Sequence, residues 1–232
     1  MKTFQLNAEP RTDLGKKATK ALRGANLIPA VVNGGKLIQF DKNENGEWVY
    51  NGQLEAGEKA IVTTASGKGV ITTDITVKVN DVRKLVYSPE VFVIDLTFNG
   101  KTRKAVLKDI QFHPLNDSIL HMDFLEVSEE KPVVVEIPVH VSGHAAGVKA
   151  GGKLYFNLKK VKVKGIYTKL PEDIVVDVTN VGIGGAIKVA DLKFDDFELV
   201  SAKELVVTGV RATRAAAAAA ATAAESEEAG EE

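Results

Sequence analysis

The stretch from residue 11 to residue 35 carries a group of cationic side chains at helical spacing. Lys16, Lys20 and Arg23 recur at intervals of four and three residues, which places them on one face of a helix, and Lys17 lies beside them. Cations in such a row can neutralise the phosphates of a polyanion, and release of condensed counterions then makes binding fall with salt. A basic row is equally common as a solvated helix surface, so the charge pattern alone leaves both interpretations open.

The flanking residues predict the elements that hold this row. Gly15 can open a turn before a helix, and Gly24 with Asn26 can close it. A small apolar stripe falls on another face of the same helix, formed by Ala18, Leu22 and Ala25. A β-strand over residues 28–32 follows at once. The pattern therefore predicts a short helix that lies on a core and faces an anion.

The order of these parts resembles a known family. An arginine at position 11, Gly15-Lys16, a small basic helix and then Ile28-Pro29-Ala30-Val31-Val32 before glycines is similar to the opening of the bacterial large-subunit ribosomal protein that binds 5S rRNA. Within that family, the chain resembles most specifically the long, two-domain form, which is called the general stress protein CTC type. The resemblance implies a structural component of the large ribosomal subunit. Its implied RNA-binding residues are Arg11, Lys16, Lys17, Thr19, Lys20, Arg23, Gln111 and His121.

A second part of the resemblance lies in two closing strands, over residues 109–114 and 119–124. In the second strand His121 and Asp123 alternate with apolar residues, so they point to one side and the apolar residues to the other. The family implies that this polar side, Gln111 included, touches RNA. The other interpretation is that His121 and Asp123 simply pair with each other on a wet face.

Three positions depart from the family pattern. Gly15-Lys16-Lys17 stands where Gly-Lys-Gly is usual, Lys20-Ala21 where two arginines are usual, and Asn33 where a tyrosine is usual. Loss of an arginine removes a bidentate donor for phosphate, and loss of the aromatic removes a stacking plane. The extra Lys17 adds a charge.

Composition is consistent with a cytoplasmic, ribosomal protein. The 232 residues are 44% hydrophobic and 26% charged, as in a soluble globular protein, and contain no cysteine. The first residues are too polar for a secretory signal, and no apolar run could span a membrane. The net charge of −1 hides an asymmetry: residues 1–30 hold six cations against two anions, and residues 225–232 hold five glutamates. A basic head predicts a polyanionic partner.

The predicted fold class is mainly β with few short helices. The predicted domains are a β-barrel-like RNA-binding domain over residues 1–128, with an inserted β region at about 36–75, a β-rich domain over 132–210, and an Ala-rich acidic disordered tail over 211–232. A glycine loop at 143–152 resembles that of the family's second domain. A short helix is expected over 82–87, with Asn80-Asp81 as its N-cap, and a hairpin turn at Asn99-Gly100.

The sequence gives little support for a nucleotide-binding, metal-binding or catalytic function. Gly67 and Gly69 lack a following Gly-Lys-Ser/Thr and helix, so a phosphate loop is disfavoured. His140 and His144 have metal-ligand spacing only on a helix, which Ser142-Gly143 interrupts. No catalytic arrangement is recognisable, so we expect no enzyme, cofactor or metal. The expected partners are 5S rRNA, with one copy per ribosome, and neighbouring large-subunit proteins. The alternative function is a protein-interaction or stress-adaptor β module without nucleic acid.

Overall fold

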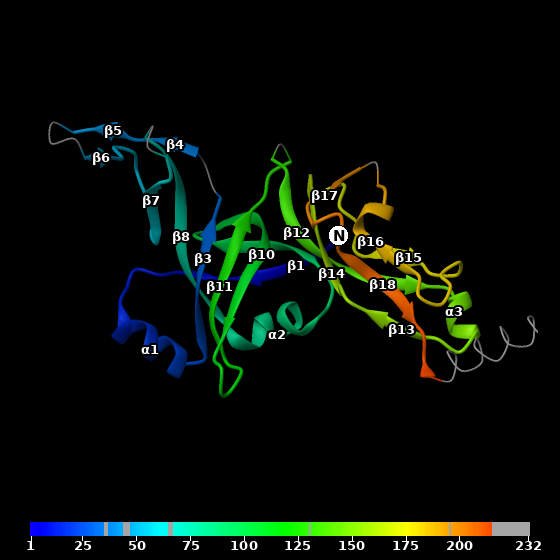
Figure 1. Ribbon diagram of the computed structural model, residues 1–232. Coiled ribbons are helices and arrows are strands. Elements are labelled where there is room, and N and C mark those ends of the chain that lie inside the picture. Colours follow the sequence, from blue (N-terminus) through cyan, green and yellow to red (C-terminus); the bar gives the residue numbers. More distant parts are fainter. Residues whose placement is uncertain (35–36, 44–46, 65–66, 130, 195, 215–232) are drawn as a thin grey trace, which may run out of the picture. The chain divides into compact units, whose positions relative to one another are not determined.

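The computed structural model describes residues 1–34, 37–43, 47–64, 67–129, 131–194 and 196–214. The chain forms two compact units: Met1–Val133 with Ile166–Thr168, and Val134–Gly165 with the chain from Lys169 onward. Both consist mainly of strands, with short helices between them (Figure 1). The predicted fold class is therefore confirmed.

The first unit contains two helices, α1 Lys16–Gly24 and α2 Val79–Tyr87, within the described residues. Its strands are β1 Lys2–Asn7, β2 Glu9–Pro10, β3 Leu27–Asn33, β4 Leu37–Gln39, β5 Asp41–Lys42, β6 Trp48–Val49, β7 Glu58–Val62, β8 Lys68–Lys78, β9 Phe92–Phe98, β10 Lys101–Phe112 and β11 Ile119–Glu126. Except for β5 and β6, which pair with each other, these strands form one sheet in the order β1-β9-β10-β11-β3-β8-β2, with β4 and β7 also paired to β8. The β1–β9 and β11–β3 pairs are parallel.

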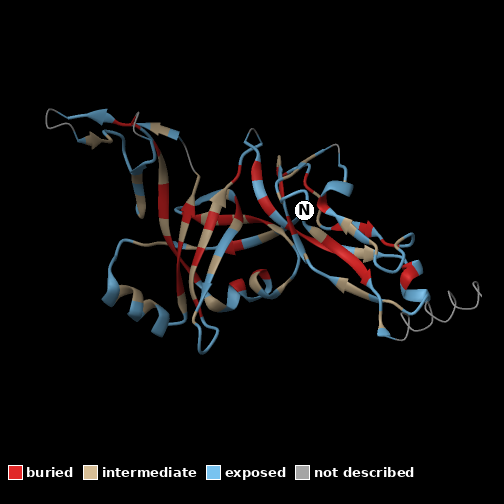
Figure 2. Ribbon diagram, in the orientation of Figure 1, coloured by how far each residue is buried: buried red, intermediate tan, exposed pale blue. Residues whose placement is uncertain are grey.

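One face of this sheet is dry because its strands alternate in polarity. In β11, Met122 and Phe124 are fully buried, while His121 and Asp123, which alternate with them, are only half-buried. Leu6 on β1 and Ile94 on β9 join the same cluster, and α2 contributes Val82 and Leu85 to it. Figure 2 shows this core as buried segments along the neighbouring strands. Of the predicted inward positions, Leu6, Met122 and Phe124 lie in the core, and Phe4 and Ala8 pack against it. Leu120 is only half-buried, and Ile119 is buried instead, where the register between β10 and β11 shifts.

The block predicted as an insertion, residues 36–75, contains part of this core. β8 pairs with β3 from Leu27↔Lys78 to Val32↔Thr73, and Ile75 is completely buried. β4 and β7 pair with the outer part of β8. The end of the block is therefore a central strand of the main sheet, and only its earlier part projects from it.

The predicted N-cap of the second helix is wrong. The helix begins three residues earlier than expected, with Lys78 at the N-cap and no side-chain cap, and Asn80 and Asp81 lie within its first turn. The helix continues directly from β8, so the backbone of Val79 donates to the carbonyl of Asn26 at 3.1 Å. The hairpin turn at Asn99-Gly100 is confirmed, with φ of 51° and 70° at the two residues.

The second unit contains two small sheets with buried valines between their polar residues. Its elements are β12 Val133–Ser142, α3 Ala146–Lys149, β13 Lys153–Phe156, β14 Lys160–Gly165, β15 Ile174–Asp177, β16 Ala186–Lys188, the 3₁₀ helix η1 Val189–Asp191, β17 Glu198–Leu199 and β18 Val206–Arg211. The sheet orders are β15-β12-β14-β17 and β13-β18-β16. At the start of the segment predicted as a tail, Arg211 belongs to β18 and the Thr213 hydroxyl donates to the Gly151 carbonyl at 2.7 Å. Residues 215–232 lie outside the described residues.

Candidate nucleic-acid interface

The basic helix α1 begins without a side-chain cap. Its N-cap is Gly15, with φ of 102°, and its first turn contains no acidic residue. The first backbone N–H groups of an α-helix have no partner within the helix, and the helix dipole favours an anion beside them. The start of α1 is therefore open to an anionic group at the position where two lysines follow each other.

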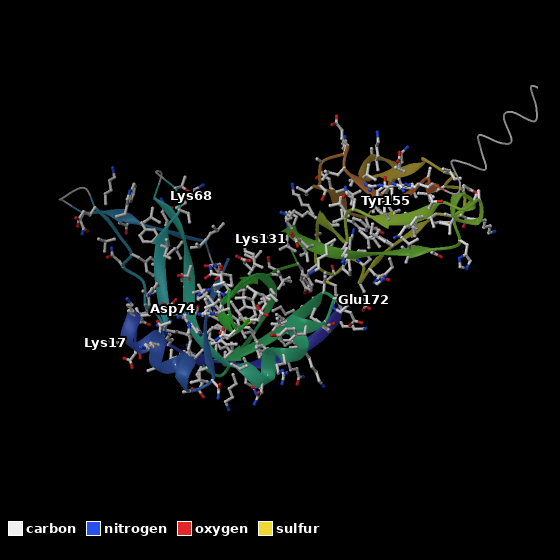
Figure 3. The ribbon with its side chains drawn as sticks, turned by 60° about the horizontal axis from the view of Figure 1, so that its bottom comes forward. Lys17, Lys68, Asp74, Lys131, Tyr155 and Glu172 are labelled. Carbon is white, nitrogen blue, oxygen red and sulfur yellow. The ribbon has the colours of Figure 1, made fainter. Side chains whose placement is uncertain are left out.

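The three lysines of α1 are exposed. Lys16, Lys17 and Lys20 form no ion pair and no side-chain hydrogen bond with any part of the chain that the structure describes. Figure 3 shows Lys17 on the outer side of the helix. The apolar stripe opposite is shallow: Ala18 and Leu22 are half-buried, while Ala25, expected to share that face, is exposed as the C-cap.

Several cations elsewhere in the same unit are paired. Lys59 lies 2.6 Å from Asp74, and Arg103 lies 2.9 Å from the buried carboxylate of Glu58. Lys101 pairs with Glu55 and lowers the pKa of that carboxyl group through their hydrogen bond. These pairs join residues that only the folded sheet brings together, so sequence reasoning missed them. The contrast leaves the lysines of α1 as charges that the described fold does not neutralise.

Two of the predicted site residues fix the start of α1. The Arg11 guanidinium donates to the Thr19 hydroxyl at 2.8 Å and to the Asp13 carbonyl at 2.9 Å, and the Thr19 hydroxyl donates to the Gly15 carbonyl at 2.8 Å. The backbone of Arg11 is itself anchored, because its N–H donates to the Asp74 carbonyl at 2.9 Å. Arg11 and Thr19 therefore position the loop that opens the helix.

Arg23 joins the other end of α1 to the sheet. Its Nε and Nη2 atoms donate to the carbonyl of Leu120 on β11, at 3.2 and 2.9 Å. This contact brings the helix next to the strand that carries His121. No sequence pattern predicts this contact, since the acceptor is a backbone atom 97 residues away.

We expect Arg23→Met to loosen α1 without unfolding the sheet. The substitution keeps most of the side-chain length but removes both hydrogen bonds to Leu120, which costs about 1 kcal/mol. Native-state hydrogen exchange should then be faster at the amides of residues 19–24 than in wild type. Exchange at the core strand β11 should not change, and equal acceleration there would contradict a local role.

The remaining predicted residues lie together on the outer face of β10 and β11. Gln111 is opposite His121 in the antiparallel register, and both side chains face away from the core. Nδ1 of His121 lies 3.0 Å from Oδ1 of Asp123. The pairing considered from the sequence is therefore present, and it orients the imidazole ring on an accessible surface.

The structure thus brings the eight predicted residues into one unit as two groups linked by Arg23. The first group is α1 with its opening loop, and the second is the outer face of β10 and β11. No group of three or more potential metal ligands occurs among the described residues, and no helix described is both long and apolar enough to cross a membrane.

The fold and this surface define a mainly β protein in two units, with a basic helix beside the main sheet of the first. Residues 6–63 and 56–124 match the model of the Ribosomal L25p family, and residues 132–214 match the model of Ribosomal protein TL5, C-terminal domain. The chain belongs to the ribosomal L25p family, in its long, two-domain form. Family membership confirms the prediction of a structural ribosomal protein rather than an enzyme.

Similar proteins share most of the chain. It is 44% identical over 214 residues to large ribosomal subunit protein bL25 of Phocaeicola vulgatus, covering 92% of this chain and 94% of that protein. It is 44% identical over 215 residues to the protein of the same name from Porphyromonas gingivalis, covering 92% and 95%. The bL25 of Bacteroides thetaiotaomicron is 51% identical over 139 residues, covering 60% and 71%.

Proposed function

We propose that this protein binds 5S rRNA in the large ribosomal subunit through α1 and the outer face of β10 and β11. The observation that carries the proposal is that Lys16, Lys17 and Lys20 are exposed on one short helix and have no carboxylate partner among the described residues. Lys59, Lys101 and Arg103 of the same unit already have such partners, whereas these three charges are available to phosphates.

The two groups of residues are proposed to contact different parts of the RNA, according to where they lie. The lysines and the open start of α1 contact phosphates, which gives affinity and register but no sequence information. Gln111 and His121 project from a β surface, which suits the wide, shallow minor groove of an RNA helix with its 2′-hydroxyl groups. Arg11, Thr19 and Arg23 hold the helix at the angle that lets both groups act on one RNA segment, and the remaining N–H donors of the two arginines face the same partner.

A titration of the full chain against 5S rRNA, with tRNA as competitor and at two salt concentrations, tests this function. We expect a complex that excess tRNA does not displace, with an affinity that falls by about 0.7 to 0.9 log units per log unit of salt for each phosphate contacted. Equal displacement by tRNA would contradict specific recognition. It would favour a protein-interaction module whose helix binds polyanions without selection.

A further inference from the structure

A hollow of about 550 Å³ lies beside α2, away from the eight residues considered above. Its lining residues are Arg83, Lys84, Tyr87, Ser88 and Phe92. The first three belong to the exposed side of the helix, whose other side buries Val82 and Leu85 in the core. The hollow therefore combines two cations and two aromatic rings on a rigid support.

The charge in this hollow is not compensated by the described residues. Arg83 and Lys84 are both exposed and form no ion pair there. Glu90, which follows the helix, lies 2.6 Å from the ammonium group of Lys2. The hollow thus presents positive charge to solvent, as α1 does.

The aromatic residues of the hollow differ in their support. Phe92 is half-buried, and its ring centroid lies 5.8 Å from that of Phe4, so it is fixed by the sheet. Tyr87 is 65% exposed at the last position of α2. An exposed ring beside a cationic groove is the combination with which proteins bind unpaired nucleotides, because every base has a face that can stack.

The start of α2 is joined by a backbone hydrogen bond to the chain just after α1. The N–H of Val79 at the start of α2 donates to the carbonyl of Asn26, just after the end of α1, at 3.1 Å. Leu27 and Lys78 are paired in the adjoining strands. Figures 1 and 3 show both helices along the same edge of the first unit. The two helices are thus carried by paired strands of one sheet, within the same unit.

We infer that the hollow beside α2 receives an unpaired nucleotide of the RNA that α1 binds. The base stacks on Tyr87, with Phe92 as the floor, and the adjoining phosphates lie against Arg83 and Lys84. The inference rests on the proposed function, and it adds a recognition site outside the eight residues assigned above. Charge decides the class of partner, since two uncompensated cations flank the rings.

Substitutions in the full chain separate stacking from charge. Tyr87→Ala should weaken binding to 5S rRNA about 5- to 100-fold without changing the dependence on salt, whereas Tyr87→Phe, which keeps the ring, should bind like wild type. Arg83→Gln with Lys84→Gln should lower the slope of log affinity against log salt by about 1.4 to 1.8, because two phosphate contacts are lost. Ultraviolet crosslinking should join Tyr87 to one RNA position in wild type.

The control is Lys149→Gln with Lys153→Gln, which removes two exposed lysines from the second unit and should leave the slope unchanged. If wild type binds 5S rRNA and both α2 variants match it in affinity and slope, the hollow holds no RNA and the inference is overturned, even if those variants lose a protein partner. If wild type itself does not bind 5S rRNA selectively, the proposed function fails first, so the two failures are distinguishable.

Discussion

Charge reversal on α1, by Lys16→Glu with Lys20→Glu, is expected to weaken binding to 5S rRNA about 100-fold at 0.1 M salt. Two phosphate contacts are lost, which alone accounts for about 1.4 to 1.8 log units relative to 1 M salt, and the new carboxylates repel the RNA. The fold should persist, because neither lysine pairs with another described residue. A glutamate in the first turn also interacts favourably with the helix dipole.

Equilibrium binding and ribosome co-sedimentation would measure this effect, with circular dichroism to verify the fold. Lys149→Glu with Lys153→Glu provides the matched control, since it makes the same change of net charge on exposed residues of the second unit. The control should reduce affinity far less than the α1 variant. Equal losses from the two variants would mean that only overall charge matters and that α1 is not the contact.

Phe124→Ala is expected to destabilise the first unit by about 3 to 5 kcal/mol. Phe124 is completely buried on β11, which lies between β10 and β3 in the main sheet. Removal of its ring leaves a cavity that strands paired on both sides cannot close, and the loss is a large part of the stability of a typical domain. Urea unfolding followed by circular dichroism would measure it.

Phe112→Ala is the matched control for this prediction. Phe112 lies on the neighbouring strand β10 but is 42% exposed, so its removal should cost about 1 kcal/mol or less. The transition of the second unit should stay in place in both variants, because that unit has its own core. Equal costs at the two positions would contradict the assignment of Phe124 to the core and of Phe112 to the outer surface.

The parts of the fold that the sequence predicted well are those controlled by local pattern. The alternation of His121 and Asp123 with Met122 and Phe124 predicted correctly which of these side chains of β11 point inward, and Asn99-Gly100 has the backbone angles that its turn requires. The basic helix was predictable for the same reason. Gly15 and Gly24 bound it, and its lysines recur at helical spacing.

The parts that were missed depend on partners distant in sequence. The direct passage of β8 into α2 places Asn80 and Asp81 inside the helix, although their types favour a cap. The sequence of β8 predicts part of an inserted hairpin. In the structure β8 is a central strand of the main sheet, because β3 pairs along it. The roles of Arg11 and Arg23 as anchors require knowledge of the Thr19 hydroxyl and the Leu120 carbonyl. The hollow beside α2 could not be predicted from the helix alone, because Phe92, which lines it, belongs to β9.

The parallel pairs of the main sheet bear on how the protein is made. β1 and β3 are completed only by β9 and β11, since Lys2 pairs with Phe92 and Ala30 with Met122. During translation the basic helix therefore leaves the exit tunnel long before the strand that supplies the carbonyl for Arg23. A nascent chain therefore carries the positive charge of α1 before the strands that position this helix have been made. A fragment ending before β11 would attract RNA through this charge but would lack the β surface proposed to recognise the RNA.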